Sequence, residues 1–190
     1  LPLPALSDWR RIDGTLSAGK DSPFTIIGVA VEAAGREVGE WSQPMIEVAE
    51  PGLLALLVAN VDGVLRLLVQ LRIEPGLIDV AELAPSVQHQ PPGLEPSLDQ
   101  SELRMLAVSA SRSDIRFDTV LSEEGGRFFH TRNRHLIVEV APFEAPPGYR
   151  WLTLAQIREL LRHSYYANVQ MRSLLSCLNS LLAKADPSGE

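Results

Sequence analysis

Two long apolar segments near the middle of the chain restrict the fold more than any other feature. Residues 53–59 and 64–73 are rich in leucine and valine and are joined by Asn60-Val61-Asp62-Gly63. An Asp-Gly pair favours the tight turn of a β-hairpin, because both residues accept a positive φ. We therefore expect the two segments to pair as antiparallel strands inside the main sheet.

Further strand patterns flank this hairpin. Residues 24–31 and 41–48 are rich in β-branched and other apolar residues, and Pro44 in the second segment indicates an edge or a bulge. Residues 128–141 are expected to form one long strand. Strands dominate the first half of the chain and helices the end, an order that favours an α+β fold or a mixed sheet with helices packed on it.

Two helices are predicted in the middle of the chain. Residues 101–109 are a weak candidate. Residues 113–124 are a stronger one, because Gly125-Gly126 supplies the glycine that commonly ends a helix. Between the strands and these helices, residues 89–100 contain three prolines and no periodic pattern, which predicts a long loop.

Two more helices are predicted near the end of the chain. Thr153 and Gln156 have the spacing of a capping box, which marks a helix start. The last helix, about residues 168–184, carries an apolar stripe with the period of a helix, so it packs either on the core or on a partner. The stripe consists of Met171, Leu174, Leu175, Leu178, Leu181 and Leu182.

Charge and composition exclude several classes of protein. The 190 residues include 17 Lys and Arg against 24 Asp and Glu, for a formal net charge of −7, so an overall basic surface for nucleic acid is absent. A single cysteine, Cys177, permits neither an internal disulfide nor a zinc cluster. No apolar run approaches the ~18 residues of a membrane span, and the first residues lack the order of a signal peptide. We expect a cytoplasmic protein with an N-terminal segment (1–22), one domain (23–184) and a flexible tail (185–190).

Common catalytic motifs are missing. Neither a dinucleotide-binding glycine motif, a phosphate-binding loop, a nucleophile elbow nor a zinc-protease motif occurs. Residues 122–126 resemble the end of a Nudix box, but Thr119 and Val120 stand where that box has its arginine and first glutamate. Because these ligands are absent, we expect no metal site and no diphosphate hydrolysis.

A basic run stands out in this acidic chain. Arg127, Arg132 and Arg134 occur within eight positions, and guanidinium groups bind phosphate through two hydrogen bonds. The run therefore predicts a local site for a diphosphate; the alternative is a solvated strand whose charges have no partner.

Three side chains of the same segment are candidates for proton transfer. His130 and His135 lie in the basic run, and histidine is the usual proton carrier near neutral pH. Glu139 follows in an apolar strand, where an unpaired carboxylate is costly. Glu139 is either paired with an arginine or an acid/base group, and either histidine can instead be structural.

Polar side chains of other strands are candidates for substrate binding. Gln70 and Arg72 lie on one face of the second hairpin strand, and Gln70 with Gln88 or Gln43 can line a polar pocket. The alternative is the solvent face of an antiparallel sheet. Trp41 can stack on a base or a sugar, although tryptophan more often packs in a core.

An ordered series of short motifs extends over about residues 4–176. The motifs are Trp41-Ser42-Gln43-Pro44, residues 70–76, 83–88 and 122–128, Asn133-Arg134, Ile137-Val138-Glu139, residues 151–156, and Asn168 with Arg172-Ser173. The series resembles the NDP-hexose 2,3-dehydratases of deoxysugar biosynthesis in antibiotic-producing bacteria, in which the motifs run in the same order.

The resemblance implies a Nudix-like mixed β-sheet flanked by helices, without the Nudix catalytic box. It also implies a carbon–oxygen lyase whose substrate is a nucleotide-diphosphate 4-keto-6-deoxyhexose. The C4 ketone acidifies the C3 proton, and the C2 hydroxyl leaves as water. Such a reaction needs a base, a donor to the enolate oxygen and an acid, but no metal or other cofactor.

Members of the family look like two tandem copies of such a unit, whereas this chain carries one. We therefore expect a homodimer, the commonest oligomer. Two alternative functions stay open: a dehydratase or cyclase for another natural-product intermediate of the polyketide type, and a non-catalytic binding subunit.

Overall fold

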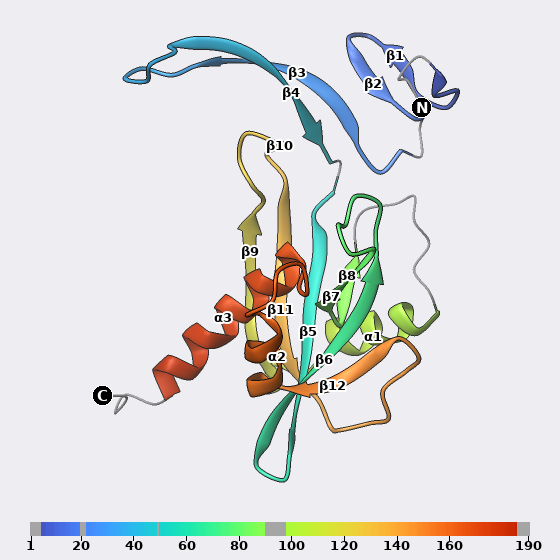
Figure 1. The fold of residues 1–190 in the computed structure, drawn as a ribbon, viewed down its shortest axis with the longest axis vertical. Helices are drawn as coiled ribbons and strands as arrows, with labels where there is room; N and C mark the ends of the chain where they lie inside the picture. The colour runs from blue at the N-terminus through green and yellow to red at the C-terminus, as the bar shows by residue number, and fades with distance from the viewer. Residues whose placement is uncertain (1–4, 20–21, 49, 90–97, 186–190) are drawn as a thin grey trace. The chain divides into compact units, whose positions relative to one another are not determined.

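The structure, a computed structural model of the chain, describes residues 5–19, 22–48, 50–89 and 98–185 (Figure 1). It divides into two units, which we describe separately. The first contains residues 1–52, 90–95 and 121–133, and the second contains residues 53–89, 96–120 and 134–190. Most of the loop predicted at 89–100 and most of the predicted tail lie outside the described residues.

The first unit is built on a five-stranded sheet with the order β1-β2-β3-β4-β10. Its strands are β1 (Arg10–Ile12), β2 (Thr15–Ser17), β3 (Thr25–Glu32), β4 (Glu40–Glu47) and β10 (Phe128–Phe129). The strands predicted at 24–31 and 41–48 are confirmed as β3 and β4.

Pro44 lies in β4, where an edge or a bulge was predicted. Residues two apart in a strand point their N–H groups to the same side, so position 44 faces the same neighbour as Ile46. The N–H of Ile46 points away from β3 and donates to the carbonyl of Arg127. The short strand β10 begins opposite Ile46 and runs on past it. The missing donor of Pro44 therefore points to the free edge of β4, where no ladder bond is lost.

The second unit contains a seven-stranded sheet whose main path is β12-β6-β5-β11-β9. Its strands are β5 (Gly52–Val61), β6 (Val64–Ile73), β7 (Ala81–Pro85), β8 (Val87–His89), β9 (Ile115–Ser122), β11 (Arg132–Glu139) and β12 (Tyr149–Thr153). The predicted central hairpin is confirmed as β5 and β6. Asp62 and Gly63 both have positive φ, 53° and 79°, as its tight turn requires.

The hairpin strands pair next to their turn and then separate. Beyond the paired residues, β7 joins β6 and β8 joins β5, so these two short strands fill the fork. Ser86, the residue between them, is fully buried. Its hydroxyl donates to the carbonyl of Leu68 at 2.6 Å and accepts from the N–H of Leu57 at 2.8 Å. One side chain thus bridges the two strands where their ladder stops.

Three helices accompany this sheet: α1 (Leu98–Val108), α2 (Leu154–Leu160) and α3 (Val169–Ala185). The capping box predicted at the start of α2 is present, because Thr153 and Gln156 each bond the backbone of the other. The helices predicted at 101–109 and 168–184 are also confirmed. Within the described residues, none of the helices is both long and apolar enough to cross a membrane.

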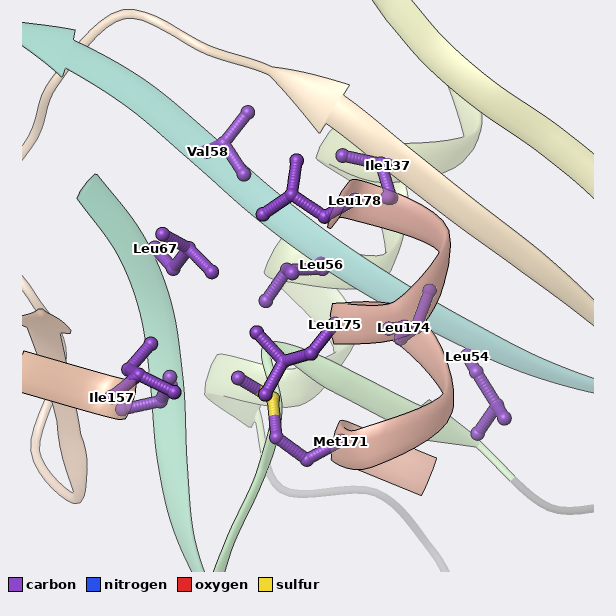
Figure 2. Packing of buried hydrophobic residues seen from close by; sticks show 11 residues of the cluster. Leu54, Leu56, Val58, Leu67, Ile137, Ile157, Met171, Leu174, Leu175 and Leu178 are labelled. Carbon is purple, nitrogen blue, oxygen red and sulfur yellow. The ribbon is translucent and has the colours of Figure 1, made fainter. Parts of the chain in front are cut away.

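Apolar side chains fill both faces of the second sheet. Alternate residues of β5 enter opposite clusters, which explains its unbroken apolar sequence. One cluster includes α2 and α3, and the other includes α1. Figure 2 shows the side chains of α3 over β5 and β6. Four of the six stripe residues of α3, Met171, Leu174, Leu175 and Leu178, are buried there. The stripe therefore closes the core of its own unit.

The helix predicted at 113–124 is wrong, because this segment forms β9. Ile115 and Phe117 are half-buried against the core clusters, whereas Arg116 and Asp118 make ion pairs at the surface. This alternation has the period of a strand. Gly125 and Gly126, which were expected to end a helix, lie instead in the turn after β9, where Gly126 has a φ of 83°.

The single strand predicted at 128–141 is also wrong in part. The chain turns between β10 and β11, and His130 in this break has a φ of 53°, outside the strand region. The segment after the break, β11, carries Leu136, Ile137 and Val138 into the core as the apolar pattern predicts.

Candidate functional site

The candidate residues divide between the two units. Those in the first unit are Trp41, Gln43, Arg127, His130 and Arg132. Those in the second unit are Gln70, Arg72, Gln88, Arg134, His135 and Glu139.

A cavity of about 1010 Å³ occupies the first unit. Its floor is one face of β3 and β4, where Val29, Val31 and Met45 alternate with outward residues. Phe128 and Phe129 of β10 also line the cavity. The cavity has the size and the mainly apolar lining of a small-molecule site.

Trp41 and Gln43 lie together on the floor of this cavity. The indole N–H of Trp41 donates to Oε1 of Gln43 at 2.8 Å, and Nε2 of Gln43 donates to the carbonyl of Gly126 at 2.5 Å. These bonds hold the indole ring and tie β4 to the turn between β9 and β10. The ring is half-buried and lines the cavity, as a stacking platform would.

His130 also lines the cavity. Its ring stacks on Phe129 with 4.2 Å between centroids and an interplanar angle of 16°. A non-glycine residue held at positive φ costs of order 1–3 kcal/mol, and such residues cluster at functional sites. Of the two candidate histidines, His130 is the one that the cavity exposes.

Two arginines and one carboxylate give the cavity its charge. Arg36 and Arg132 line it, and neither takes part in an ion pair within the described part of the chain. Glu123 lines it too and accepts a hydrogen bond from the side-chain amide of Asn133. Arg127 lies outside this lining and pairs with Glu124 at 3.6 Å.

Sequence reasoning missed Arg36, Glu123 and Phe129 as cavity residues. Glu123 belongs to the motif at 122–128 and Phe129 directly follows it, so this motif was the sequence feature that could have indicated both residues. Arg36 lies in the turn between β3 and β4 and carries no pattern of its own.

A buried polar network occupies the fork of the second sheet. Gln88 is 1% exposed, and its Nε2 donates to the carboxylate of Glu74 at 3.2 Å while its Oε1 accepts from Asn168 at 2.8 Å. Arg72 donates to the same carboxylate oxygen at 2.5 Å. Because a flipped amide would place donor against donor, this network determines the orientation of Gln88. Gln70 lies apart and accepts from Gln100 at 3.1 Å.

The remaining candidates of the second unit lie on β11. Glu139 accepts from Nε and Nη2 of Arg116, at 2.8 and 2.5 Å, so of its two predicted alternatives the structure shows the pairing with an arginine. The role of Glu139 in proton transfer stays a prediction. Arg134 binds Asp118 through two bonds of 2.7 Å. The hydrogen bond from Arg134 lowers the pKa of Asp118, and the same bond raises the pKa of Arg134. An anion at Arg134 must therefore displace a bound carboxylate.

His135 is 4% exposed within β11 and lines neither this cavity nor the smaller one of about 600 Å³ beside Glu139. Its candidate role in proton transfer stays a prediction. Within the described ranges, no group of three or more His, Cys, Asp or Glu side chains lies close enough to hold a metal ion.

These features define an α+β protein of the Nudix-like class, with mixed sheets and three described helices. A crystal structure of an ADP compounds hydrolase matches 92% of this chain and 95% of its own, with a TM-score of 0.53 and 18% sequence identity. This likeness shows the fold alone. The predicted Nudix-like α+β fold is thereby confirmed.

The chain belongs to the NDP-hexose 2,3-dehydratase family, whose sequence profile matches residues 1–178. It is 42% identical over 188 residues to a dTDP-4-dehydro-6-deoxy-alpha-D-glucopyranose 2,3-dehydratase of Saccharopolyspora spinosa, and 38% identical over 192 residues to one of Amycolatopsis orientalis. These alignments cover 96% and 100% of this chain but 39% and 40% of the relatives. The chain thus spans about two-fifths of their length.

Proposed function

We propose that this chain is a dehydratase unit that acts on dTDP-4-dehydro-6-deoxy-glucose or a closely similar nucleotide sugar. The observation that carries the proposal is the 38–42% identity over nearly the whole chain to relatives that bear this activity in their names. The family match over residues 1–178 supports it.

The chemistry follows from the substrate. A base removes the proton on C3, which the neighbouring C4 ketone makes acidic, and the electron pair forms an enolate across C3 and C4. Expulsion of the C2 hydroxyl, protonated by an acid, then releases water and leaves a C2–C3 double bond. Donors placed at the enolate oxygen stabilise the charge that develops there.

The cavity of the first unit supplies groups that suit a nucleotide diphosphate sugar. The indole of Trp41 offers a face for the base. The guanidinium groups of Arg36 and Arg132, which form no ion pair with the residues that the structure describes, suit the diphosphate. His130 is the proton carrier in this proposal, because its ring is exposed in the same cavity. Arg127, Gln70, Arg72, Gln88 and Arg134 remain predictions for substrate binding, and His135 and Glu139 remain predictions for proton transfer.

A coupled assay tests the activity. The purified chain is incubated with the 4-keto sugar nucleotide and a 3-ketoreductase with its nicotinamide cofactor, and products are identified by mass spectrometry. We expect a 2-deoxy sugar nucleotide, formed by loss of one water and reduction. The Saccharopolyspora spinosa relative is the positive control. If it forms product and this chain does not, even with excess protein, catalysis by this chain alone is excluded.

Deuterium exchange separates binding from elimination. In D₂O without the reductase, a chain that abstracts the C3 proton but does not expel the hydroxyl incorporates deuterium at C3 of recovered substrate. Thermal shift with dTDP then reports binding alone, since ligand at about 100 times its Kd adds about 2.7 kcal/mol of stability. Binding without exchange would favour the binding-subunit alternative over an enzyme.

Variants test the cavity. His130→Ala should abolish exchange with dTDP binding retained, and Arg36→Gln with Arg132→Gln should weaken dTDP binding at least about tenfold, the loss of roughly one charge-assisted bond. Arg11→Gln is the matched control, because Arg11 is exposed in β1 of the same unit and does not line the cavity. If His130→Ala, the double arginine variant and Arg11→Gln all lost dTDP binding and C3 exchange to the same extent, the site would lie elsewhere. The cytoplasmic location and the homodimer remain predictions alongside this proposal.

A further inference from the structure

One carboxylate lines the cavity of the first unit and has no role in the function proposed above. Glu123 directly follows β9 and is half-buried, and it is the acidic residue among the described residues that line this cavity. A half-buried carboxylate needs hydrogen-bond donors to offset the hydration that it loses. The donors that the chain supplies to Glu123, and those that it leaves to a ligand, therefore indicate what this side chain binds.

Two hydrogen bonds hold Glu123 in place. Its backbone N–H donates to the carbonyl of Thr131 at 2.9 Å, and the side-chain amide of Asn133 donates to its Oε1. Asn133 is itself held, because its Oδ1 accepts the N–H of Gly52 at 2.9 Å. Within the described residues, the carboxylate of Glu123 forms no other hydrogen bond and no ion pair. The chain thus orients the carboxylate through Oε1 and leaves Oε2 to a ligand in the cavity.

The cavity has two chemically different ends. Arg36 and Trp41 lie at the end formed by the turn between β3 and β4. Glu123 lies at the other end, beside the turn after β9, which is hydrogen-bonded to Ile46 of β4. Trp41 and Ile46 are five residues apart in β4, which corresponds to about 17 Å along a strand. The two ends can therefore bind different parts of one elongated ligand.

The charges of the cavity favour one direction for such a ligand. A carboxylate repels a phosphate but accepts hydrogen bonds from hydroxyl groups, and a hydrogen bond to a charged oxygen is about twice as strong as one between neutral groups. The diphosphate is therefore favoured near Arg36 and Arg132, and the hydroxyl-bearing sugar near Glu123. Ser122 precedes Glu123 and Thr131 lies beside it, so the same end of the cavity also carries two neutral hydroxyls.

We propose that Glu123 determines the specificity of the cavity for the sugar by accepting a hydrogen bond from its C3 hydroxyl. The backbone bond to Thr131 places Glu123 beside the segment of His130, and both side chains line the cavity. The two side chains then suit the two substituents of one carbon, the C3 proton for His130 and the C3 hydroxyl for Glu123. This inference rests on the proposed function.

The chemistry of the elimination favours the C3 hydroxyl over the C2 hydroxyl as the partner of Glu123. The C3 hydroxyl keeps its bond to carbon when water is lost. A carboxylate bound to the C2 hydroxyl would instead oppose the protonation that allows this group to leave. A site that binds a substrate hydroxyl rejects an analogue without it, because the protein group is then left unpaired. Glu123 therefore selects a sugar that carries the C3 hydroxyl.

A binding cycle tests the contact. Isothermal titration calorimetry measures the Kd of dTDP-glucose, which has no C4 ketone to acidify its C3 proton, and of its 3-deoxy and 2-deoxy analogues. The parent chain should bind the 3-deoxy analogue at least about tenfold more weakly than dTDP-glucose, the loss of one hydrogen bond to a charged group. The 2-deoxy analogue should be weakened less. In Glu123→Ala the ratio of the Kd values for the 3-deoxy analogue and dTDP-glucose should fall to near one, while dTDP binds as well as before or more tightly.

Glu124→Ala is the matched control. Glu124 is exposed in the same turn, pairs with Arg127 at 3.6 Å and does not line the cavity, so this variant should keep the ratio of the parent chain. If circular dichroism shows that Glu123→Ala is unfolded, Glu123→Gln replaces it, since its amide oxygen can still accept from Asn133. The ratio in Glu123→Gln should also fall, because a neutral oxygen accepts a weaker bond.

The outcomes separate this inference from the proposed function. If dTDP binding and C3 exchange are present in the parent chain, but the Glu123 variants keep its ratio or Glu124→Ala lowers it equally, the proposed function stands and the role of Glu123 is wrong. A parent chain that binds the 3-deoxy analogue as tightly as dTDP-glucose would also overturn this role. A parent chain that binds neither dTDP nor dTDP-glucose would contradict the proposed function, and this inference with it.

Discussion

The side-chain amide of Asn168 donates a hydrogen bond to Oε1 of Gln88 at 2.8 Å and so joins the start of α3 to β8. The other end of the same amide caps the helix, since Oδ1 of Asn168 accepts the N–H of Met171 at 2.9 Å. Both side chains are buried. The side chain of Asn168 thus provides hydrogen-bond partners both for a backbone N–H at the start of α3 and for the buried amide of Gln88.

Asn168→Ala tests this double role. The variant removes the cap and leaves the Oε1 atom of Gln88 without its donor, so we expect a loss of about 2–4 kcal/mol from the two effects. Urea denaturation measures it. Asn179→Ala in the same helix is the control, because Asn179 is exposed and bonds only Arg158 among the described residues. That variant should change stability by less than about 0.5 kcal/mol.

Ser86 at the fork of the second sheet provides a second test. Ser86→Ala leaves the N–H of Leu57 and the carbonyl of Leu68 unsatisfied in a buried site, so we expect a loss of about 1–3 kcal/mol. Ser180→Ala is the control, because the hydroxyl of Ser180 lies exposed on α3 and bonds only its own helix. Equal stability of the two variants in urea would show that the fork does not depend on the hydroxyl.

The apolar stripe of α3 predicts a graded response. Leu174→Ala should cost about 2–5 kcal/mol, because Leu174 is fully buried in the core. Leu182→Ala should cost far less, because Leu182 is 37% exposed at the end of the same stripe. Leu178→Asp should give unfolded or insoluble protein, since it places an unpaired carboxylate among leucines. A soluble folded monomer from Leu178→Asp would instead assign the stripe to an interface.

Local patterns predicted the parts of the fold that local energetics determine. Asp62 and Gly63 specify a turn by their own φ preferences, and Thr153 with Gln156 specify a helix start through two adjacent bonds. The segment at 115–122 carries two conflicting signals, because the glycines after it are typical of a helix end whereas its two-residue alternation is typical of a strand, and it forms β9. The break at His130 was not predictable from the sequence, because histidine adopts a positive φ more often than most residues but still only in a small minority of cases.

The candidate site was harder to predict because its parts meet through tertiary structure. Gln88 and Asn168 are 80 positions apart, and only the pairing of β8 and the direction of α3 bring them together. The cavity residue Arg36 depends likewise on the turn between β3 and β4. Arg132 and His130 of the basic run line one cavity, whereas Arg134, two residues on, is bound by Asp118.

His130 should show a conflict between stability and function. His130→Gly removes the steric cost of a positive φ, which is roughly 1–2 kcal/mol for an L-residue, against an entropic cost of about 0.5–1 kcal/mol for glycine in the unfolded chain. We expect unchanged or slightly raised thermal stability together with loss of C3 exchange. His130→Val, a β-branched residue in the same conformation, should be the less stable variant. The reverse order of melting temperatures would contradict the strain.

The pair of Asp118 and Arg134 should make stability depend on pH in the acid range. The pKa of Asp118 in the folded chain lies below its ordinary value of 3.8, chiefly because Arg134 donates a hydrogen bond to the charged form. The unfolded chain therefore binds this proton first as the pH falls, so the pair stabilises the fold above about pH 4. The contribution is lost as the pH falls through the lower folded-state pKa.

Carboxyl NMR titration of Asp118 measures this directly. In the parent chain the resonance should titrate below 3.8, and in Arg134→Gln its midpoint should rise. The difference in melting temperature between the parent and Asp118→Ala should be present at pH 6, shrink below pH 4, and be smaller at high salt, because both side chains are about two-fifths exposed and therefore screened. A midpoint that does not move in Arg134→Gln would show that the guanidinium is not what lowers the pKa of Asp118.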